Sequence, residues 1–270
     1  MKKTLLVCLI VVLVVIASAF GIGYGVGHLI KNAGNISISN GSSFNYSDAK
    51  SYKAGDAEIS SKVSKLTINW LSGNVKVSEY SGDTLIIKDE VESGVLSDEL
   101  KLRWKKSADE VVVQYAEAGK KLNLDGFKKN LLVMIPSSWV LDELEIDVVS
   151  ADSVVSLKNI EKIDWNSVNG TLEVRIDSIH SLDGETVNGD VDLYVSKDGP
   201  RELDLESVNS NVIISVPSNT SFTLKHDSVN GSLDSEFAGK VSGNKTFIVG
   251  SGDYDWDIES VNGDIIIRER

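Results

Sequence analysis

Five copies of one short phrase constrain the fold of this chain more than any other feature of the sequence. The copies are "NSVNG" at residues 166–170, "ETVNG" at 185–189, "ESVNS" at 206–210, "DSVNG" at 227–231 and "ESVNG" at 259–263. Successive asparagines of the phrase are separated by 19, 21, 21 and 32 residues, and they are Asn169, Asn188, Asn209, Asn230 and Asn262. A repeat of about 20 residues is typical of proteins in which one structural unit stacks on the next.

The residues on both sides of the phrase alternate between apolar and polar. Apolar residues stand three positions after each asparagine, at Leu172, Val191, Val212, Leu233 and Ile265. Apolar residues also stand six positions before it, at Ile163, Leu182, Leu203, Leu224 and Trp256. Alternation with a period of two indicates a strand with one buried face. Each repeat therefore predicts a strand, a corner, a second strand and a return.

The phrase itself is predicted to form the corner. Glycine accepts the backbone conformations of tight corners, and asparagine tolerates them better than most residues. If repeats stack in register, the asparagine amides form a hydrogen-bonded ladder, in which Asn188 and Asn230 are the neighbours of Asn209 and Asn262 lies at the end. "SADS" at 150–153 resembles a degenerate earlier copy with Asp152 in the asparagine position. A repeated ligand-binding motif is the alternative interpretation.

The predicted fold is all-β, a single-domain β-solenoid of parallel β-helix type with about 20 residues per coil, over residues 58–270. Residues 65–91 alternate in the same way and are predicted to form the first coils. Residues 97–135 are irregular. The long last interval predicts a hairpin or a partial extra coil, and Ile265–Ile267 a short terminal strand.

The first 30 residues predict export. Lys2 and Lys3 precede thirteen apolar residues, and no further charged side chain appears before Lys31. "ASA" at 17–19 matches a signal-peptide cleavage site, but the apolar run is long enough for an uncleaved membrane-spanning helix, which we favour. The positive N-terminus is expected to stay in the cytoplasm. Residues 31–57, rich in Ser, Asn and Gly, are expected to be a tether.

The net charge of −13 comes from the body, because residues 1–60 carry a small excess of basic side chains. Such a surface is expected to repel nucleic acid and other polyanions, and its simplest interpretation is solubility. The single cysteine, Cys8, excludes an internal disulfide.

No constellation predicts catalysis, a cofactor or a metal. His180 and His226 have no partner at zinc-ligand spacing. Asp253, Asp255, Asp257 and Glu259 alternate along one strand, but the glycine of a calcium loop is replaced by Ile258, so an outward acidic face is preferred. The sequence therefore predicts neither catalytic nor metal-binding residues.

The whole pattern resembles a known family. "SVNGTLEV", "TVNGDVDL" and "GDYDWDIESVNGDIIIRE", together with the apolar N-terminus, are similar to the bacterial membrane-anchored putative-adhesin domains of the YvlB and LiaG type. The resemblance covers roughly residues 55–270 and implies an extracytoplasmic domain linked to envelope stress. It supplies no catalytic residues, and the irregular segment 97–135 departs from it.

Three functions remain open at this point. The first is a non-catalytic binding or scaffolding protein of the cell envelope, anchored by a single span, with an envelope protein or glycan as partner. The second is a polysaccharide-active enzyme, an analogy at the level of the fold only. The third is a regulatory partner of a membrane sensor, acting through the glycine-rich N-terminal segment.

Overall fold

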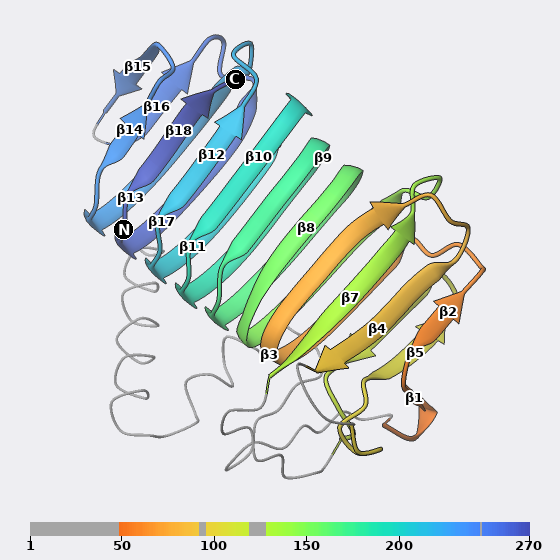
Figure 1. Ribbon diagram of the computed structural model, residues 1–270. Helices are drawn as coiled ribbons and strands as arrows, with labels where there is room; N and C mark the ends of the chain where they lie inside the picture. Colours follow the sequence, from red (N-terminus) through yellow and green to blue (C-terminus); the bar gives the residue numbers. More distant parts are fainter. Residues whose placement is uncertain (1–48, 92–95, 119–127, 244) are drawn as a thin grey trace, which may run out of the picture.

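The structure is a computed structural model that describes residues 49–91, 96–118, 128–243 and 245–270 (Figure 1). The expected membrane helix, residues 1–30, lies outside these ranges. Within them, no helix is both long enough and apolar enough to cross a membrane. Residues 49–57 were assigned to the tether from sequence, but they form a short 3-10 helix, η1, a two-residue strand and the start of the next strand. The folded body therefore includes them.

The all-β prediction is confirmed over the described residues. Preceding the repeats are η1 (Ala49–Ser51), β1 (Lys53–Ala54), β2 (Ala57–Ile59), β3 (Lys65–Tyr80), β4 (Leu85–Val91), β5 (Arg103–Ser107), β6 (Glu110–Gln114) and β7 (Lys129–Pro136). The repeats comprise β8 (Leu141–Asn169), β9 (Leu172–Asn188), β10 (Val191–Asp198), β11 (Glu202–Asn209), β12 (Val212–Val216), β13 (Phe222–Asn230), β14 (Leu233–Ser235), β15 (Gly239–Ser242), β16 (Thr246–Val249), β17 (Tyr254–Asn262) and β18 (Ile265–Glu269).

Each repeat contributes a leading strand before the corner and a trailing strand after it. Leading strands pair in parallel with leading strands, so that Asn169 is opposite Asn188 and Asn188 opposite Asn209. Trailing strands pair in the same way, with Leu172 opposite Val191 and Val191 opposite Val212. The longest strands bend through several of these segments, since β8 contains two leading segments and one trailing segment. The chain thus places equivalent residues of successive repeats side by side.

The last repeat does not lie at the end of the stack. β17 pairs in parallel with β11 on one side and with β13 on the other. β18 likewise lies between β12 and β14, so Ile265–Ile267 are internal rather than terminal. The hairpin β15–β16 makes this possible, because β16 pairs antiparallel with the outer side of β13 and the chain then crosses to the inner side. The sequence order of the repeats is therefore not their spatial order.

The core lies between leading and trailing strands. Alternate residues of every repeat point inward, and the largest of them, Trp70, Trp165 and Trp256, are almost completely buried. Burial of one such side chain stabilises the fold by about 2–3 kcal/mol. The apolar positions that identified the repeats in the sequence, such as Leu182 and Ile265, are the core positions of the structure.

Both ends of the stack are closed by antiparallel strands (Figure 1). At one end, β5 pairs with β6 and β4 with β7, and the outermost strands are β1 and β2. At the other end the outermost strands are β14 and β15. These four edge strands have two to four residues each. Residues 85–91, predicted to continue the first coils, are therefore part of an antiparallel end.

Candidate functional site

The corner asparagines form a continuous line of side-chain hydrogen bonds. Asn188 donates to Asn169 at 2.9 Å, and Asn209 donates to Asn188 at 2.8 Å. Asn262 then donates to Asn209 at 2.7 Å, and Asn230 donates to Asn262 at 2.9 Å. The sequence prediction that Asn230 is the neighbour of Asn209 is therefore wrong, because the inserted β17 brings Asn262 there. Four of these side chains are exposed and Asn262 is half-buried, so water reaches them.

A second line of hydrogen bonds runs two residues after the first. Asp152 accepts from the backbone N–H and the hydroxyl of Thr171, at 2.9 and 3.0 Å. Asp190 and Asp264 make equivalent contacts with Asn211 and Ser232. The pairing of β8 with β9 has an offset of 19 residues, which puts Ser150 in the asparagine position and Asp152 opposite Thr171. Assigning Asp152 to the asparagine position from sequence was thus an error of two residues.

The corner glycines are required by contact between neighbouring repeats. A Cβ atom on Gly189 would lie 1.8 Å from the carbonyl oxygen of Gly170, and one on Gly170 would lie 2.0 Å from that of Ala151. The equivalent atom on Gly263 would lie 1.9 Å from the carbonyl oxygen of Ser210. Separations this short do not occur between non-bonded atoms, so any side chain would push the repeats apart. Close backbone approach thus adds to the conformational reason inferred from sequence.

The outward side of the leading strands is strongly acidic. Three rows of equivalent positions run along it, and together we call them the acidic face. The middle row is Thr67, Glu145, Asp164, Asp183, Asp204, Asp257 and Lys225. The inner row, nearer the corner, is Asn69, Asp147, Asn166, Glu185, Glu206, Glu259 and Asp227. The outer row is Lys65, Glu143, Lys162, Ser181, Glu202, Asp255 and Thr223. Neighbouring strands of a sheet lie about 4.8 Å apart. Parallel in-register pairing thus brings carboxylates of successive repeats close to one another.

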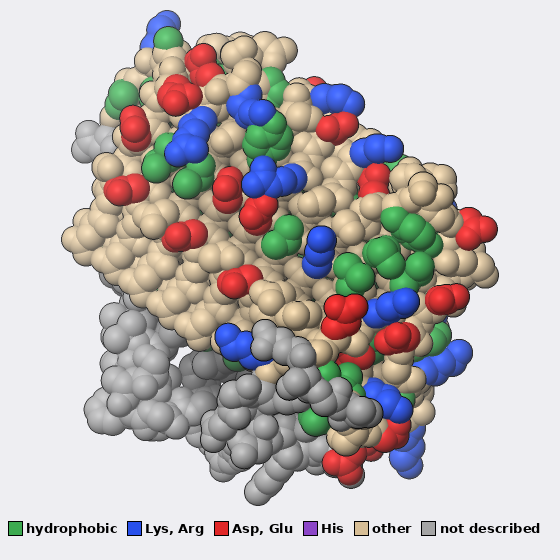
Figure 2. All heavy atoms as spheres, viewed as in Figure 1, with side chains coloured by type: hydrophobic (Ala, Val, Ile, Leu, Met, Phe, Trp, Pro, Cys, Tyr) green, Lys and Arg blue, Asp and Glu red, His purple; other side chains and the backbone are tan. Residues whose placement is uncertain are grey.

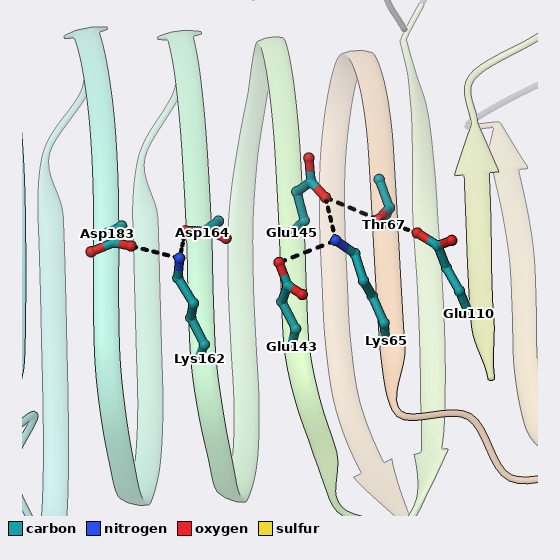
Figure 3. Close-up of polar contacts among 8 residues, drawn as sticks. All are labelled: Lys65, Thr67, Glu110, Glu143, Glu145, Lys162, Asp164 and Asp183. Atoms are coloured by element: carbon teal, nitrogen blue, oxygen red, sulfur yellow. Dashed lines mark hydrogen bonds and ion pairs between the residues drawn. The ribbon is translucent and has the colours of Figure 1, made fainter. Parts of the chain in front are cut away.

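Lysines of the chain itself lie between these carboxylates (Figure 3). The ammonium of Lys162 is 2.9 Å from Asp164 and 2.8 Å from Asp183, so it bridges two adjacent repeats. Lys65 is 3.1 Å from Glu143 and 3.3 Å from Glu145, and Thr67 also donates to Glu145. The two carboxylates raise the pKa of Lys65 in spite of its partial burial. An ammonium group therefore fits between stacked carboxylates of this face.

Two shallow hollows lie on the acidic face. The first has a volume of about 230 Å³ and is lined by Glu145, Asp164, Trp165, Asn166, Asp183, Gly184 and Glu185. The second has a volume of about 210 Å³ and is lined by Asp183, Glu202, Leu203, Asp204, Lys225, Asp255, Trp256 and Asp257. Asp183 lines both. Their linings are mainly carboxylates with few apolar side chains, which suits a cationic ligand rather than an apolar one.

Several of these acids hold their protons more tightly than usual. Burial raises the pKa of Asp147 to about 7, although the amide of Asn166 donates to it at 2.9 Å. Burial also raises the pKa of Asp164, and Lys162 opposes that shift. Burial raises the pKa of Glu185, and repulsion from the carboxylate of Asp204 adds to this effect. The charge of the acidic face therefore decreases when the pH falls below neutral.

The opposite side of the stack is different. Figure 2 shows the face that carries the trailing strands β10, β12 and β18, where acidic, basic and apolar side chains lie side by side. There Arg175 and Arg270 both lie over the ring of Tyr194. The concentration of carboxylates is thus a property of the leading strands.

The histidines and the acidic strand singled out in the sequence do not form a metal centre. His180 is half-buried and lies 3.6 Å from Glu161, and burial lowers the pKa of His226. Across the described ranges, no three His, Cys, Asp or Glu side chains are grouped so as to hold a metal ion. Asp257 and Glu259 instead continue the rows of the acidic face. Trp256, the residue before Asp257, points to the opposite side of the strand and is buried in the core.

A buried ion pair lies at the end of the stack that precedes the repeats. Lys129 is completely buried, and its ammonium contacts Asp89 at 2.6 Å and the carbonyl of Leu100 at 2.7 Å. The rings of Trp70 and Tyr115 lie 4.8 and 4.6 Å from the same ammonium. Burial lowers the pKa of Lys129 to about 8, against the opposing effect of Asp89. Nothing in the sequence pattern distinguished this lysine.

The acidic face was missed as a site, although its signal is present in the sequence. Acidic residues stand five and three positions before the asparagine in most copies, as at Asp183 and Glu185 or Asp204 and Glu206. Sequence reasoning attributed this acidity to solubility because charge was assessed for the whole body rather than by position within the repeat.

Comparison with known proteins gives similar structures but no family. No family model matches the sequence, and no curated protein matches it. A crystal structure of a putative cell adhesion protein from Clostridium sporogenes is similar with 12% identity and a TM-score of 0.48, covering 81% of this chain and 100% of that one. A putative adhesin from Bacteroides fragilis has 9% identity and a TM-score of 0.42, covering 81% and 97%. A putative lipid binding protein from Parabacteroides distasonis has 8% identity and a TM-score of 0.35, covering 80% and 96%. Likeness at this level supports no inference about function.

Proposed function

We propose that the protein is a non-catalytic binding module and that its acidic face docks a lysine-rich segment of another envelope protein. The observation that carries this proposal is the set of three in-register rows that bring carboxylates of successive repeats side by side. Rows of one charge attract a partner of opposite charge and fix its register. The extent of the face over successive repeats favours an extended partner over a small ligand.

The chain's own lysines indicate the chemistry of the partner. Lys162 bridges Asp164 and Asp183 across two repeats, and Lys225 lies 3.4 Å from Asp255 at the edge of the second hollow. An ammonium group on a flexible stem reaches such positions without altering the strands. A lysine-rich segment would make contacts of the same kind with the carboxylates of the acidic face.

The location belongs to the same proposal and rests on the sequence. The body is a β-solenoid that stands outside the cytoplasmic membrane, held by an uncleaved single span at residues 1–30 with its N-terminus inside. Its place is the bacterial cell envelope, with a role in the response to envelope stress. Fractionation tests the location: the intact chain should be in the membrane fraction, with the body open to external protease. A secreted product beginning at Phe20 would show that the segment is a cleaved signal.

Binding can be tested with decalysine as a probe of the acidic face. The full chain should bind decalysine but not decaglutamate, and binding should weaken as salt is raised, because exposed charges are screened. The variant Asp183→Asn/Glu202→Gln/Asp255→Asn removes three carboxylates that line the second hollow. It should bind roughly 3- to 160-fold more weakly, at about 0.2–1 kcal/mol per exposed ion pair.

A matched control lies on the opposite face. Glu173→Gln/Asp192→Asn/Asp234→Asn removes three negative charges from equivalent trailing-strand positions, so the net charge of the two variants is the same. This control should bind decalysine nearly as well as the unmodified chain. Equal loss in both variants would mean that only net charge matters, and the acidic face would not be a docking surface. Preference for an uncharged envelope glycan over decalysine would also contradict the proposal.

An enzyme acting on polysaccharide is the second candidate, favoured by one observation. The first hollow brings together Asp164 and Glu185, whose pKa values are both raised, as a general acid requires. Against it, equivalent carboxylates recur in most repeats, so no single position is distinguished. Asp164→Asn should abolish activity on polysaccharide if the hollow is catalytic, whereas a docking face loses only part of its affinity.

A further inference from the structure

The insertion of the last repeat creates a slot within the stack. β11 and β12 form one wall, and β13 and β14 form the other. The slot is filled by residues 254–269, which carry the same corner phrase as their two neighbours. In the described structure their strand pairings are all with these two walls, so leaving the slot breaks no other strand pairing.

The contacts in the slot are specific to this segment. Trp256 stacks on Phe222 with ring centroids 4.0 Å apart and an interplanar angle of 10°. Its indole N–H donates to the carbonyl of Pro200, two residues before β11, at 2.8 Å. Trp256 is also paired with Leu203 of β11, so it contacts both walls. At the corner, Asn262 donates to Asn209 and accepts from Asn230. A segment from a second copy of the chain would make the same contacts.

A short hinge connects the segment to the rest of the chain. Residues 250–253 cross from β16 to β17 over the start of β13, where the hydroxyl of Ser221 accepts from the backbone N–H of Gly252 at 2.9 Å. Val249 and Tyr254 are both paired with Phe222, on its two sides. The hinge therefore spans two strand spacings, roughly 9.6 Å.

We propose that the protein self-associates by exchanging residues 254–270, so that the last repeat of one copy fills the slot of another. The two copies would be related by a two-fold axis that is perpendicular to the leading strands and lies at the end of these strands where the hinge is. This arrangement brings β16 of each copy into line with the slot of the other copy. The hinge then straightens, and β16 continues into the exchanged β17, since the two strands are antiparallel within one copy. Reciprocal exchange gives a closed dimer with all native contacts retained.

Shortening the hinge tests the proposal. In a full chain that lacks residues 251–253, Val249 and Tyr254 are separated by one residue, which spans at most about 7.6 Å. Closure within one copy is then impossible without disrupting β13, whereas exchange needs only a straight connection. We expect this variant to be a dimer by light scattering, with the strand content and tryptophan emission of the unmodified chain. A folded monomer would overturn the proposal.

A synthetic peptide of residues 250–270 provides the second measurement. An excess of the peptide should convert the dimer to a monomer that carries one peptide, because the peptide occupies each slot. The same peptide with Trp256→Asp should require at least a tenfold higher concentration. If excess peptide does not dissociate the dimer, the dimer is not formed by exchange, and this result would also overturn the proposal.

Refolding of the unmodified chain decides the case if the shortened variant does not fold. Closure within one copy does not depend on concentration, whereas exchange does. Refolding from denaturant at increasing protein concentration should give an increasing fraction of dimer that persists after dilution. Monomer at every concentration would refute exchange.

Discussion

Asp147 should make the stability of this protein decrease as the pH rises from acid to neutral. The side chain is only 4% exposed, and its Oδ1 atom accepts from Asn166. Its Oδ2 atom has no hydrogen-bond partner among the residues that the structure describes. Burial raises its pKa to about 7, whereas an unfolded chain releases this proton near the ordinary value of 3.8. Between these two values the folded state binds more protons than the unfolded state, so the free energy of unfolding falls as the pH rises.

The magnitude follows from the two pKa values. At 1.36 kcal/mol per pKa unit, the difference between the two pKa values lowers the free energy of unfolding, relative to a chain in which this group does not titrate, by about 1 kcal/mol at pH 4.5 and about 4 kcal/mol at pH 8. The larger value is an upper limit, because local relaxation that admits water reduces the cost. Asp147→Asn keeps the shape and the hydrogen bond from Asn166 but cannot ionise. It should be more stable than the unmodified chain by up to about 4 kcal/mol at pH 8 and by only about 1 kcal/mol at pH 4.5.

The assay is denaturant unfolding of both chains at several pH values from 4.5 to 8. Repeat proteins can unfold in segments, so the signal should come from Trp165, which is buried in the repeat next to Asp147. Asp192→Asn is the control, since that side chain is exposed on the opposite face. A stability difference between Asp147→Asn and the unmodified chain that is the same at pH 4.5 and pH 8 would refute the reasoning.

Three further predictions concern the framework. Lys129→Met leaves a buried carboxylate without its partner and should cost about 3–5 kcal/mol in the free energy of unfolding, measured by urea titration. Gly189→Ala should cost at least about 3 kcal/mol because its Cβ atom overlaps backbone, whereas Gly199→Ala, whose Cβ atom would have nothing nearer than 3.4 Å, should cost about 1 kcal/mol or less. Asn209→Ala should cost about 0.5–1.5 kcal/mol because its partners remain exposed to water, and a double-mutant cycle with Asn262 should give a non-zero coupling energy. Strict additivity in that cycle would argue against the contact.

The repeat itself was readable from sequence because it depends on local patterns. Apolar residues such as Leu182 and Val191 alternate with polar ones, and this alternation needs no knowledge of distant contacts to identify buried strand faces. The position of the corner followed from the asparagine and glycine residues. What these patterns specify is the shape of one unit, and every unit has the same shape.

The order of the units could not be read in the same way. Asn230 and Asn262 stand in nearly identical phrases, so either could lie beside Asn209, and local pattern cannot choose between them. The choice depends on contacts outside the phrase, such as that of Trp256 with Pro200. The pairing of Lys129 with Asp89 is equally hidden, because 40 residues separate them and neither belongs to a repeat.

The short edge strands determine how such a protein can change in length. Because β1, β2, β14 and β15 offer few free backbone groups, further strands cannot simply be added at the ends. Duplication or loss of a whole repeat between the ends would keep both of them intact and would leave each remaining corner in contact with another corner. Every repeat gained in this way would extend the rows of the acidic face by one position each. The number of simultaneous charge contacts with a long cationic partner, and hence its avidity, would then vary stepwise with repeat number while each single contact stayed weak.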